Sequence, residues 1–223
     1  AETNSSGSSR TASITVSAGD GKQNQTEQVI TVSQSGLDLD AFILGIDITQ
    51  TSLKTYLPFD KAIDATIDWG DGNVEENVTS TYPTHTYTDP GYYIVSVKGS
   101  VPSLNSYDIP TYGLGNQFVE VYNWGRTGLT SMSRAFQNCR GLERIPADKT
   151  EAFAKVTAFN YAFCDCRALG SIPDGLFDHA AEAKTYEYCF QNCVLIEEVP
   201  ADLLYNSPGI TSVCSLFSGT EIS

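Results

Sequence analysis

This sequence of 223 residues has few basic side chains, and its 27 acidic residues outnumber 13 lysines and arginines to give a formal net charge of −14 at pH 7. A strongly negative surface repels the phosphates of nucleic acids and of anionic membranes, so neither is expected as a partner. The chain also lacks any run of 18 apolar residues, so no transmembrane segment is expected in it.

Histidine is scarce as well, which argues against most catalytic arrangements. The only two histidines, His85 and His179, suggest no Ser-His-Asp or Cys-His constellation. A glycosidase needs two facing carboxylates, whereas the adjacent pairs Glu75-Glu76 and Glu197-Glu198 would point to opposite faces of a strand. We therefore predict that the chain is not an enzyme and that it uses no cofactor.

From Leu129 onward, one residue pattern recurs at an interval of 27. The residues at equivalent positions are Phe136, Phe163, Phe190 and Phe217; Cys139, Cys166 and Cys193; and Pro146, Pro173 and Pro200. An interval of this size, carried by residues typical of protein interiors, indicates a leucine-rich-repeat solenoid. Equal coils would stack, so the phenylalanines should form one continuous column. Within a coil, Ala162, Phe163 and Cys166 have the spacing of a helical face.

All six cysteines fall in this repeat region, and three occupy one repeat position. We favour structural thiols in a buried column, where cysteine behaves as a small hydrophobic residue. Disulfides are the alternative if the chain is secreted. Cys164 and Cys166 also invite a zinc interpretation, but no second cysteine pair or nearby histidine supports a metal site.

The rest of the chain has strand signals. Alternating segments at 10–17 and 28–34 predict a β-hairpin, and apolar runs at 41–49, 51–57, 62–69 and 91–99 predict an antiparallel β-sandwich. We therefore expect a mainly β, multidomain chain: an N-terminal hairpin (1–36), a β-sandwich (37–114) and a repeat solenoid (115–223). A lone hairpin is marginally stable, so it should pack on the next domain, exchange with another copy or belong to a longer natural chain.

Two motifs in the first half resemble known families. Ser9-Arg10-Thr11-Ala12 and Ile30-Thr31-Val32 resemble the last two strands of a BACON domain. The W-G-D-G turn that begins at Trp69, followed by H-T-Y-T-D-P-G from His85, is similar to the PKD fold. That resemblance implies an Ig-like sandwich filled by Trp69 and an extracellular spacer or binding role. The acidic side chains from Asp68 to Glu75 leave a calcium site open, although turn chemistry explains them as well.

The repeat units resemble the BspA-type leucine-rich repeats of bacterial surface proteins. Ala135 to Pro146 reads A-F-Q-N-C-R-G-L-E-R-I-P, and Ala162 to Pro173 follows the same pattern. The resemblance implies an exported, extracytoplasmic protein of the cell surface, anchored as an outer-membrane lipoprotein in a gut-type bacterium. It does not identify a ligand.

Two functions from different classes follow. The first is adhesion to a host or bacterial surface protein through the outward residues of the L-x-x-I segments, which are Glu143, Arg144, Gly170, Ser171, Glu197 and Glu198. The second is glycan binding, as in polysaccharide-utilising gut bacteria. Tyr122 and Trp124 either cover the first coil or form an exposed platform. An exposed aromatic row beside polar groups would favour glycans, and an acidic or apolar patch on the repeats would favour protein adhesion. The oligomeric state stays open.

Overall fold

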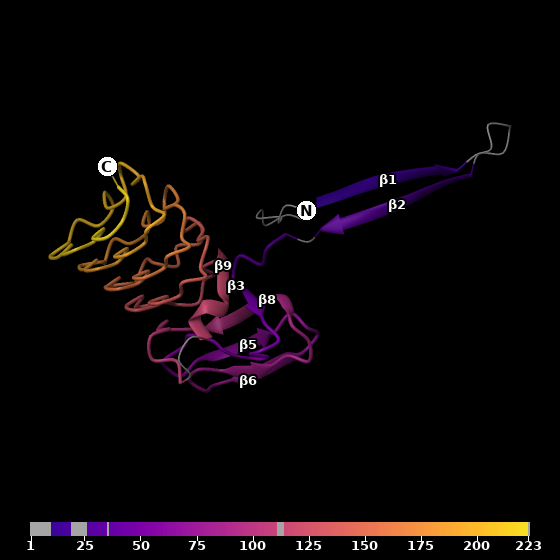
Figure 1. Ribbon diagram of the computed structural model, residues 1–223, viewed down its shortest axis with the longest axis horizontal. Helices are drawn as coiled ribbons and strands as arrows, with labels where there is room; N and C mark the ends of the chain where they lie inside the picture. Colours follow the sequence, from indigo (N-terminus) through magenta and orange to yellow (C-terminus); the bar gives the residue numbers. More distant parts are fainter. Residues whose placement is uncertain (1–9, 19–25, 35, 111–113, 223) are drawn as a thin grey trace. The chain divides into compact units, whose positions relative to one another are not determined.

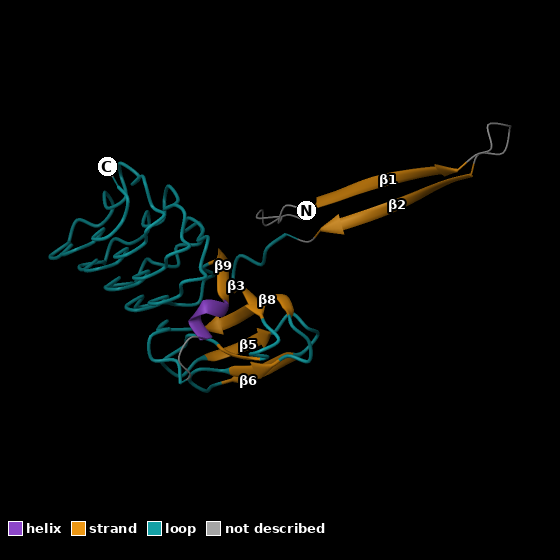
Figure 2. Ribbon diagram, in the orientation of Figure 1, coloured by secondary structure: helices purple, strands orange, loops and turns teal. Residues whose placement is uncertain are grey.

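A computed structural model of the protein describes residues 10–18, 26–34, 36–110 and 114–222. The chain divides into two compact units, Ala1–Asp38 and Leu39–Ser223. The described part is mainly β, as expected, and its only helix is the four-residue 3-10 helix η1 (Leu114–Gln117) (Figure 2).

The first unit contains a single β-hairpin. Strand β1 (Arg10–Ala18) pairs antiparallel with β2 (Thr26–Gln34) without a register shift. The alternating pattern therefore predicted this pairing correctly, and the turn that joins the strands lies outside the described residues.

The second unit begins with a five-stranded antiparallel sheet in the order β6-β5-β8-β3-β9 (Figure 1). Its strands are β3 (Phe42–Ile48), β5 (Asp64–Asp68), β6 (Val74–Val78), β8 (Gly91–Ser100) and β9 (Phe118–Asn123). A smaller sheet pairs β4 (Lys54–Tyr56) with β7 (Thr84–Thr86). Of the four expected strands, three are present in shortened form and the one at 91–99 extends to Ser100. The arrangement is consistent with a β-sandwich.

Apolar side chains on one face of the large sheet make the sandwich core. Along β3, every residue from Phe42 to Ile48 except Asp47 is buried. Successive side chains point to opposite faces of a strand, and the alternate residues Phe42, Leu44, Ile46 and Ile48 belong to the core. The ring of Phe42 lies 6.1 Å from that of Phe59. Trp69, just after β5, is completely buried and stacks 4.9 Å from the ring of His85 in β7. The expectation that Trp69 fills this core is thus confirmed.

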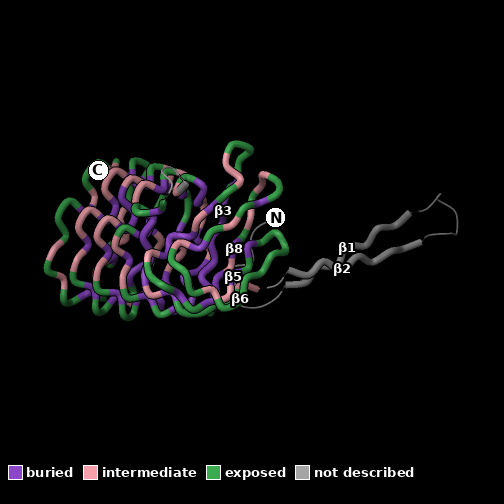
Figure 3. Tube along the Cα trace, turned by 90° about the horizontal axis from the view of Figure 1, so that it is seen from below, coloured by how far each residue is buried: buried purple, intermediate pink, exposed green. Residues whose placement is uncertain are grey.

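After β9 the chain forms successive turns in which residues 26 or 27 apart lie side by side. The backbone N–H of Phe136 donates to Ala162 at 2.7 Å, and that of Phe163 donates to Cys189 at 2.8 Å. The rings of Phe136, Phe163, Phe190 and Phe217 follow one another with centroids 5.9, 5.3 and 5.7 Å apart. The predicted phenylalanine column is therefore present, and the buried residues lie along the inside of the turns in Figure 3.

The helix suggested by the spacing of Ala162, Phe163 and Cys166 does not form. Residues Tyr161 and Asp165 have φ angles of 57° and 59°, which interrupt a right-handed helix. The backbone N–H groups instead alternate in direction. Those of Ala162 and Cys166 donate to residues three positions earlier in the same coil, whereas Phe163 and Asp165 donate to the next coil. Hydrogen bonds between coils thus replace a helical ladder.

The sheet and the coils meet along β9. One edge of β9 pairs antiparallel with β3. On the other edge, the N–H of Val121 donates to Arg144 at 3.0 Å and the N–H of Glu143 donates to Val119 at 2.8 Å. Strand β9 therefore serves as the last strand of the sheet and as the neighbour of the first coil.

Candidate functional site

The outward residues of the L-x-x-I segments lie next to one another on one flank of the repeat region. The N–H of Glu143 donates to Val119, and the N–H of Gly170 donates to Glu143 at 3.4 Å. We call this surface the flank; it comprises Val119, Glu120, Glu143, Arg144, Gly170, Ser171, Glu197 and Glu198. Successive coils therefore place on one side the residues that the sequence pattern grouped together.

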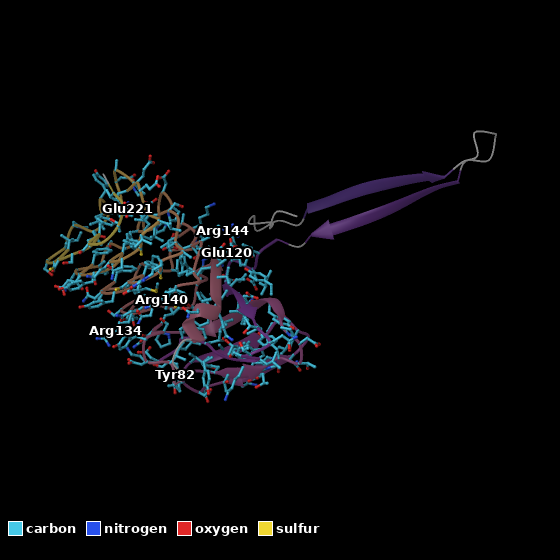
Figure 4. All side chains as sticks on the ribbon, viewed as in Figure 1. Tyr82, Glu120, Arg134, Arg140, Arg144 and Glu221 are labelled. Atoms are coloured by element: carbon cyan, nitrogen blue, oxygen red, sulfur yellow. The ribbon has the colours of Figure 1, made fainter. Side chains whose placement is uncertain are left out.

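The end of the flank nearest the sheet contains an ion pair. A guanidinium nitrogen of Arg144 donates to a carboxylate oxygen of Glu120 at 2.7 Å, and the arginine side chain is 67% exposed (Figure 4). Glu120 comes from β9 and Arg144 from the first coil, so the pair spans the junction. Tyr122, two residues after Glu120, is half-buried and its hydroxyl lies 3.0 Å from that of Tyr92.

The other end of the flank contains a groove of about 440 Å³, which we call the acidic groove. Its lining residues are Gly170, Ser171, Ile172, Asp174, Leu195, Glu197, Glu198, Val199 and Pro200. Three of these residues are acidic and none is basic. The predicted contacts Ser171, Glu197 and Glu198 thus share one concave surface with Leu195, whose side chain is 53% exposed.

Sequence reasoning missed Asp174 and Leu195, which complete this groove. Asp174 directly follows the repeat proline Pro173, and Leu195 directly precedes the buried Ile196. Both positions flank the L-x-x-I-P segment, so the same 27-residue alignment contained the signal. The exposure of Leu195 was not readable, because adjacent apolar residues in a repeat are usually assigned to the core.

Trp124 does not belong to an exposed surface. Its side chain is fully buried, with its ring 5.0 Å from that of Phe153 and 6.4 Å from that of Phe42. The indole N–H donates to the carbonyl of Pro146 at 2.9 Å. Trp124 therefore packs between the sheet and the coils, which agrees with a covering role and removes it as a direct ligand contact.

The acidic turn after β5 is occupied by internal hydrogen bonds. Asp68 accepts from the N–H of Gly70 at 2.9 Å, Asp71 lies 2.8 Å from a ring nitrogen of His85, and Glu75 accepts from the indole of Trp69 at 3.0 Å. Burial raises the pKa of Asp71, but the hydrogen bonds from His85 and Asn73 together lower this pKa by more, so its net shift is downward. These carboxylates therefore act as turn and core acceptors.

The repeated cysteines form a buried column of thiols. The Sγ–H of Cys166 donates to the carbonyl of Phe136 at 3.1 Å, and that of Cys193 donates to Phe163 at the same distance. Burial raises the pKa of both Cys139 and Cys193 to about 12. These thiols are protonated at neutral pH and take the structural role that we favoured. Cys164 instead points to Asp165 and Gln191, so Cys164 and Cys166 make separate contacts.

Comparisons with protein-family models, with curated proteins and with solved structures found no match for this chain. Within the residues that the structure describes, no helix has the length and apolar character required to cross a bilayer. The candidate site is therefore defined by its own geometry.

Proposed function

We propose that this chain is a non-catalytic binding protein of the cell surface, and that the acidic groove on its flank holds a basic segment of a protein partner. In this proposal the coils are a BspA-type leucine-rich-repeat solenoid and the sheets are a PKD-like module that supports them. The protein acts outside the cytoplasm, as an outer-membrane lipoprotein. The motifs of the sequence and the stacking of equivalent residues support this assignment.

The observation that carries the proposal is the charge of the groove. Asp174, Glu197 and Glu198 are exposed, and none of them has an ion-pair or hydrogen-bond partner among the described residues. A lysine or arginine of a partner would find acceptors there, while its methylene groups packed against the exposed side chain of Leu195. The net charge of −14 would also speed the approach of a basic partner.

A binding screen against host extracellular-matrix proteins and bacterial surface proteins tests this proposal. The unchanged chain should bind at least one basic protein, and raising the salt concentration should weaken that binding, because salt screens exposed charges. Glu197→Lys/Glu198→Lys reverses the charge of the groove and should weaken binding by about tenfold or more.

The matched control is Glu182→Lys/Glu221→Lys, which makes the same change in net charge at two exposed residues outside the groove. It should retain most of the affinity. Equal losses in both double variants would show that only net charge matters, and binding that does not respond to the groove variant would contradict the proposed site.

A further inference from the structure

A second surface lies on the outer face of the large sheet, where two tyrosines meet above a glycine. Tyr92 comes from β8 and Tyr122 from β9, the two strands on either side of β3. Their hydroxyls are 3.0 Å apart. A Cβ atom on Gly45 of β3 would lie 2.0 Å from the hydroxyl oxygen of Tyr92 and 3.1 Å from the ring of Tyr122. Both side chains therefore lean over β3 instead of standing upright on the sheet.

This arrangement pairs the two hydroxyls with each other while Tyr92 stays partly exposed to solvent. The Tyr92 side chain is 47% exposed, although its hydroxyl is bonded to that of Tyr122. Burial, followed by this hydrogen bond, raises the pKa of Tyr92. Ile94, the cross-strand partner of Gly45, adds an apolar side chain that is 45% exposed. We call Tyr92, Tyr122 and Ile94 the tyrosine platform.

A row of three other tyrosines, Tyr107, Tyr161 and Tyr188, does not form such a platform. The rings of Tyr161 and Tyr188 stack on each other with centroids 4.7 Å apart and planes at 9°. The guanidinium of Arg134 lies 4.9 Å from the ring centre of Tyr107 and 5.9 Å from that of Tyr161. In that row, neighbouring groups of the same chain cover ring faces that a ligand would need.

Polar groups surround the platform, and their charges restrict the ligand. Asp47 is exposed on β3 opposite Tyr92, and Glu143 is exposed beside the Arg144–Glu120 ion pair. The basic group Arg144 at this rim is thus already paired with a carboxylate. An anionic polymer would be repelled, whereas neutral hydroxyl groups find both donors and acceptors there.

We infer that the tyrosine platform binds a neutral polysaccharide chain. A pyranose ring has apolar C–H faces that pack on aromatic rings through dispersion, and its hydroxyls project toward a polar rim. A partly exposed surface of rings and an apolar side chain, with its own hydroxyls already paired, matches that chemistry. A protein side chain would instead anchor most strongly in an enclosed pocket. This site is separate from the acidic groove, so it stands whether or not the groove binds protein.

Affinity gel electrophoresis of the full chain tests the inference. The probes are three soluble neutral polysaccharides, namely a β-1,4-xylan, a β-1,3-glucan and an α-mannan, with polygalacturonate as the anionic comparison. At least one neutral gel should retard the protein, and polygalacturonate should not. Tyr92→Ala should lower the apparent affinity for the retarding polysaccharide by about tenfold. Tyr205→Ala, which removes an 84% exposed tyrosine of the repeat region, should leave it unchanged.

Two further variants separate ring contact from loss of folding. Tyr92→Phe/Tyr122→Phe keeps both rings and should retain binding, whereas Ile94→Glu places a charge at the exposed edge without removing a ring and should abolish it. Glu197→Lys/Glu198→Lys should have no effect on retardation. The inference would be overturned if the protein bound none of the three neutral polysaccharides or if it bound only polygalacturonate. Full retardation of folded Ile94→Glu protein would also overturn it.

Discussion

The sandwich and the coil stack are both mainly apolar inside, but they are held together in different ways. In the sandwich, each contact joins residues at its own sequence separation, such as Phe42 with Phe59 or Trp69 with His85. In the coils, the stacked rings repeat at a separation of 27 residues, and the backbone hydrogen bonds between coils recur mostly at 26 or 27. A residue in the sandwich therefore has individual partners, whereas a residue in the coils depends on its copies in adjacent coils.

This difference has a consequence for stability. A repeated contact is present on both sides of an inner coil but on only one side of a terminal coil, so equivalent substitutions should have graded effects along the stack. No such gradient is expected in the sandwich, where the loss of stability depends on the individual contacts of the substituted residue.

The largest effect is expected from removing a ring in the middle of the phenylalanine column. Phe163 is fully buried between Phe136 and Phe190. Phe163→Ala should lower the free energy of unfolding by about 3–5 kcal/mol, because it leaves a cavity among tightly packed rings. Chemical denaturation measures this loss.

The matched variant is Phe217→Ala, at the equivalent position of the last coil. Phe217 is only half-buried, and among the described residues it stacks on Phe190 only. Its removal should cost less than half of the loss at Phe163. Equal losses at the two positions would contradict the expected gradient along the coils, and the coils would then not differ from the sandwich in this respect.

The next effect concerns the backbone of the coils. Asn138 has a φ of 64°, and its N–H donates to Cys164 of the next coil at 2.8 Å. Alanine tolerates positive φ poorly, so Asn138→Ala should cost about 1–2 kcal/mol, whereas Asn138→Gly should be close to neutral. Thermal unfolding distinguishes the two. A glycine variant as unstable as the alanine variant would assign the loss to the side chain of Asn138 instead.

A smaller effect, specific to the sandwich, should depend on pH. The folded pKa of Asp71 is lower than its unfolded value near 3.8, because the bonds from His85 and Asn73 outweigh burial. The ionised carboxylate therefore stabilises the fold above that unfolded pKa, and the contribution is lost as the pH falls through the lower folded pKa. The difference in the free energy of unfolding between Asp71→Asn and the unchanged protein should therefore become smaller in acid. Denaturation curves that keep a constant separation from pH 7 to below the folded pKa would contradict this assignment.

The sequence predicted the coils and the strands to different degrees. The 27-residue interval sufficed for the phenylalanine and cysteine columns, because equal coils must place equal residues together. It did not reveal that Tyr161 and Asp165 adopt positive φ. The recurrence of Asn138, Asp165, Asn192 and Gly219 was the available signal, since these residue types tolerate that conformation best.

The candidate sites were predictable only in part, for a related reason. Glu197 and Glu198 followed from their place in the repeat, but the groove depends on how Asp174 and Leu195 close around them. The tyrosine platform was even harder to predict from the sequence. Tyr92 and Tyr122 are 30 residues apart and meet only because β8 and β9 flank β3. Such pairs are fixed by sheet order, which strand patterns alone do not determine.

The smallest effect is expected where the two regions meet. Arg144 and Glu120 form a 2.7 Å ion pair, but the arginine side chain is 67% exposed, so solvent screens much of the attraction. Arg144→Ala should lower the free energy of unfolding by less than about 1 kcal/mol, and the loss should shrink further in about 1 M salt. The backbone bond from Val121 to Arg144 and the buried ring of Trp124 would hold the junction without this pair. A loss comparable to that of Phe163→Ala would instead mean that the sandwich and the coils are joined mainly through their side-chain charges.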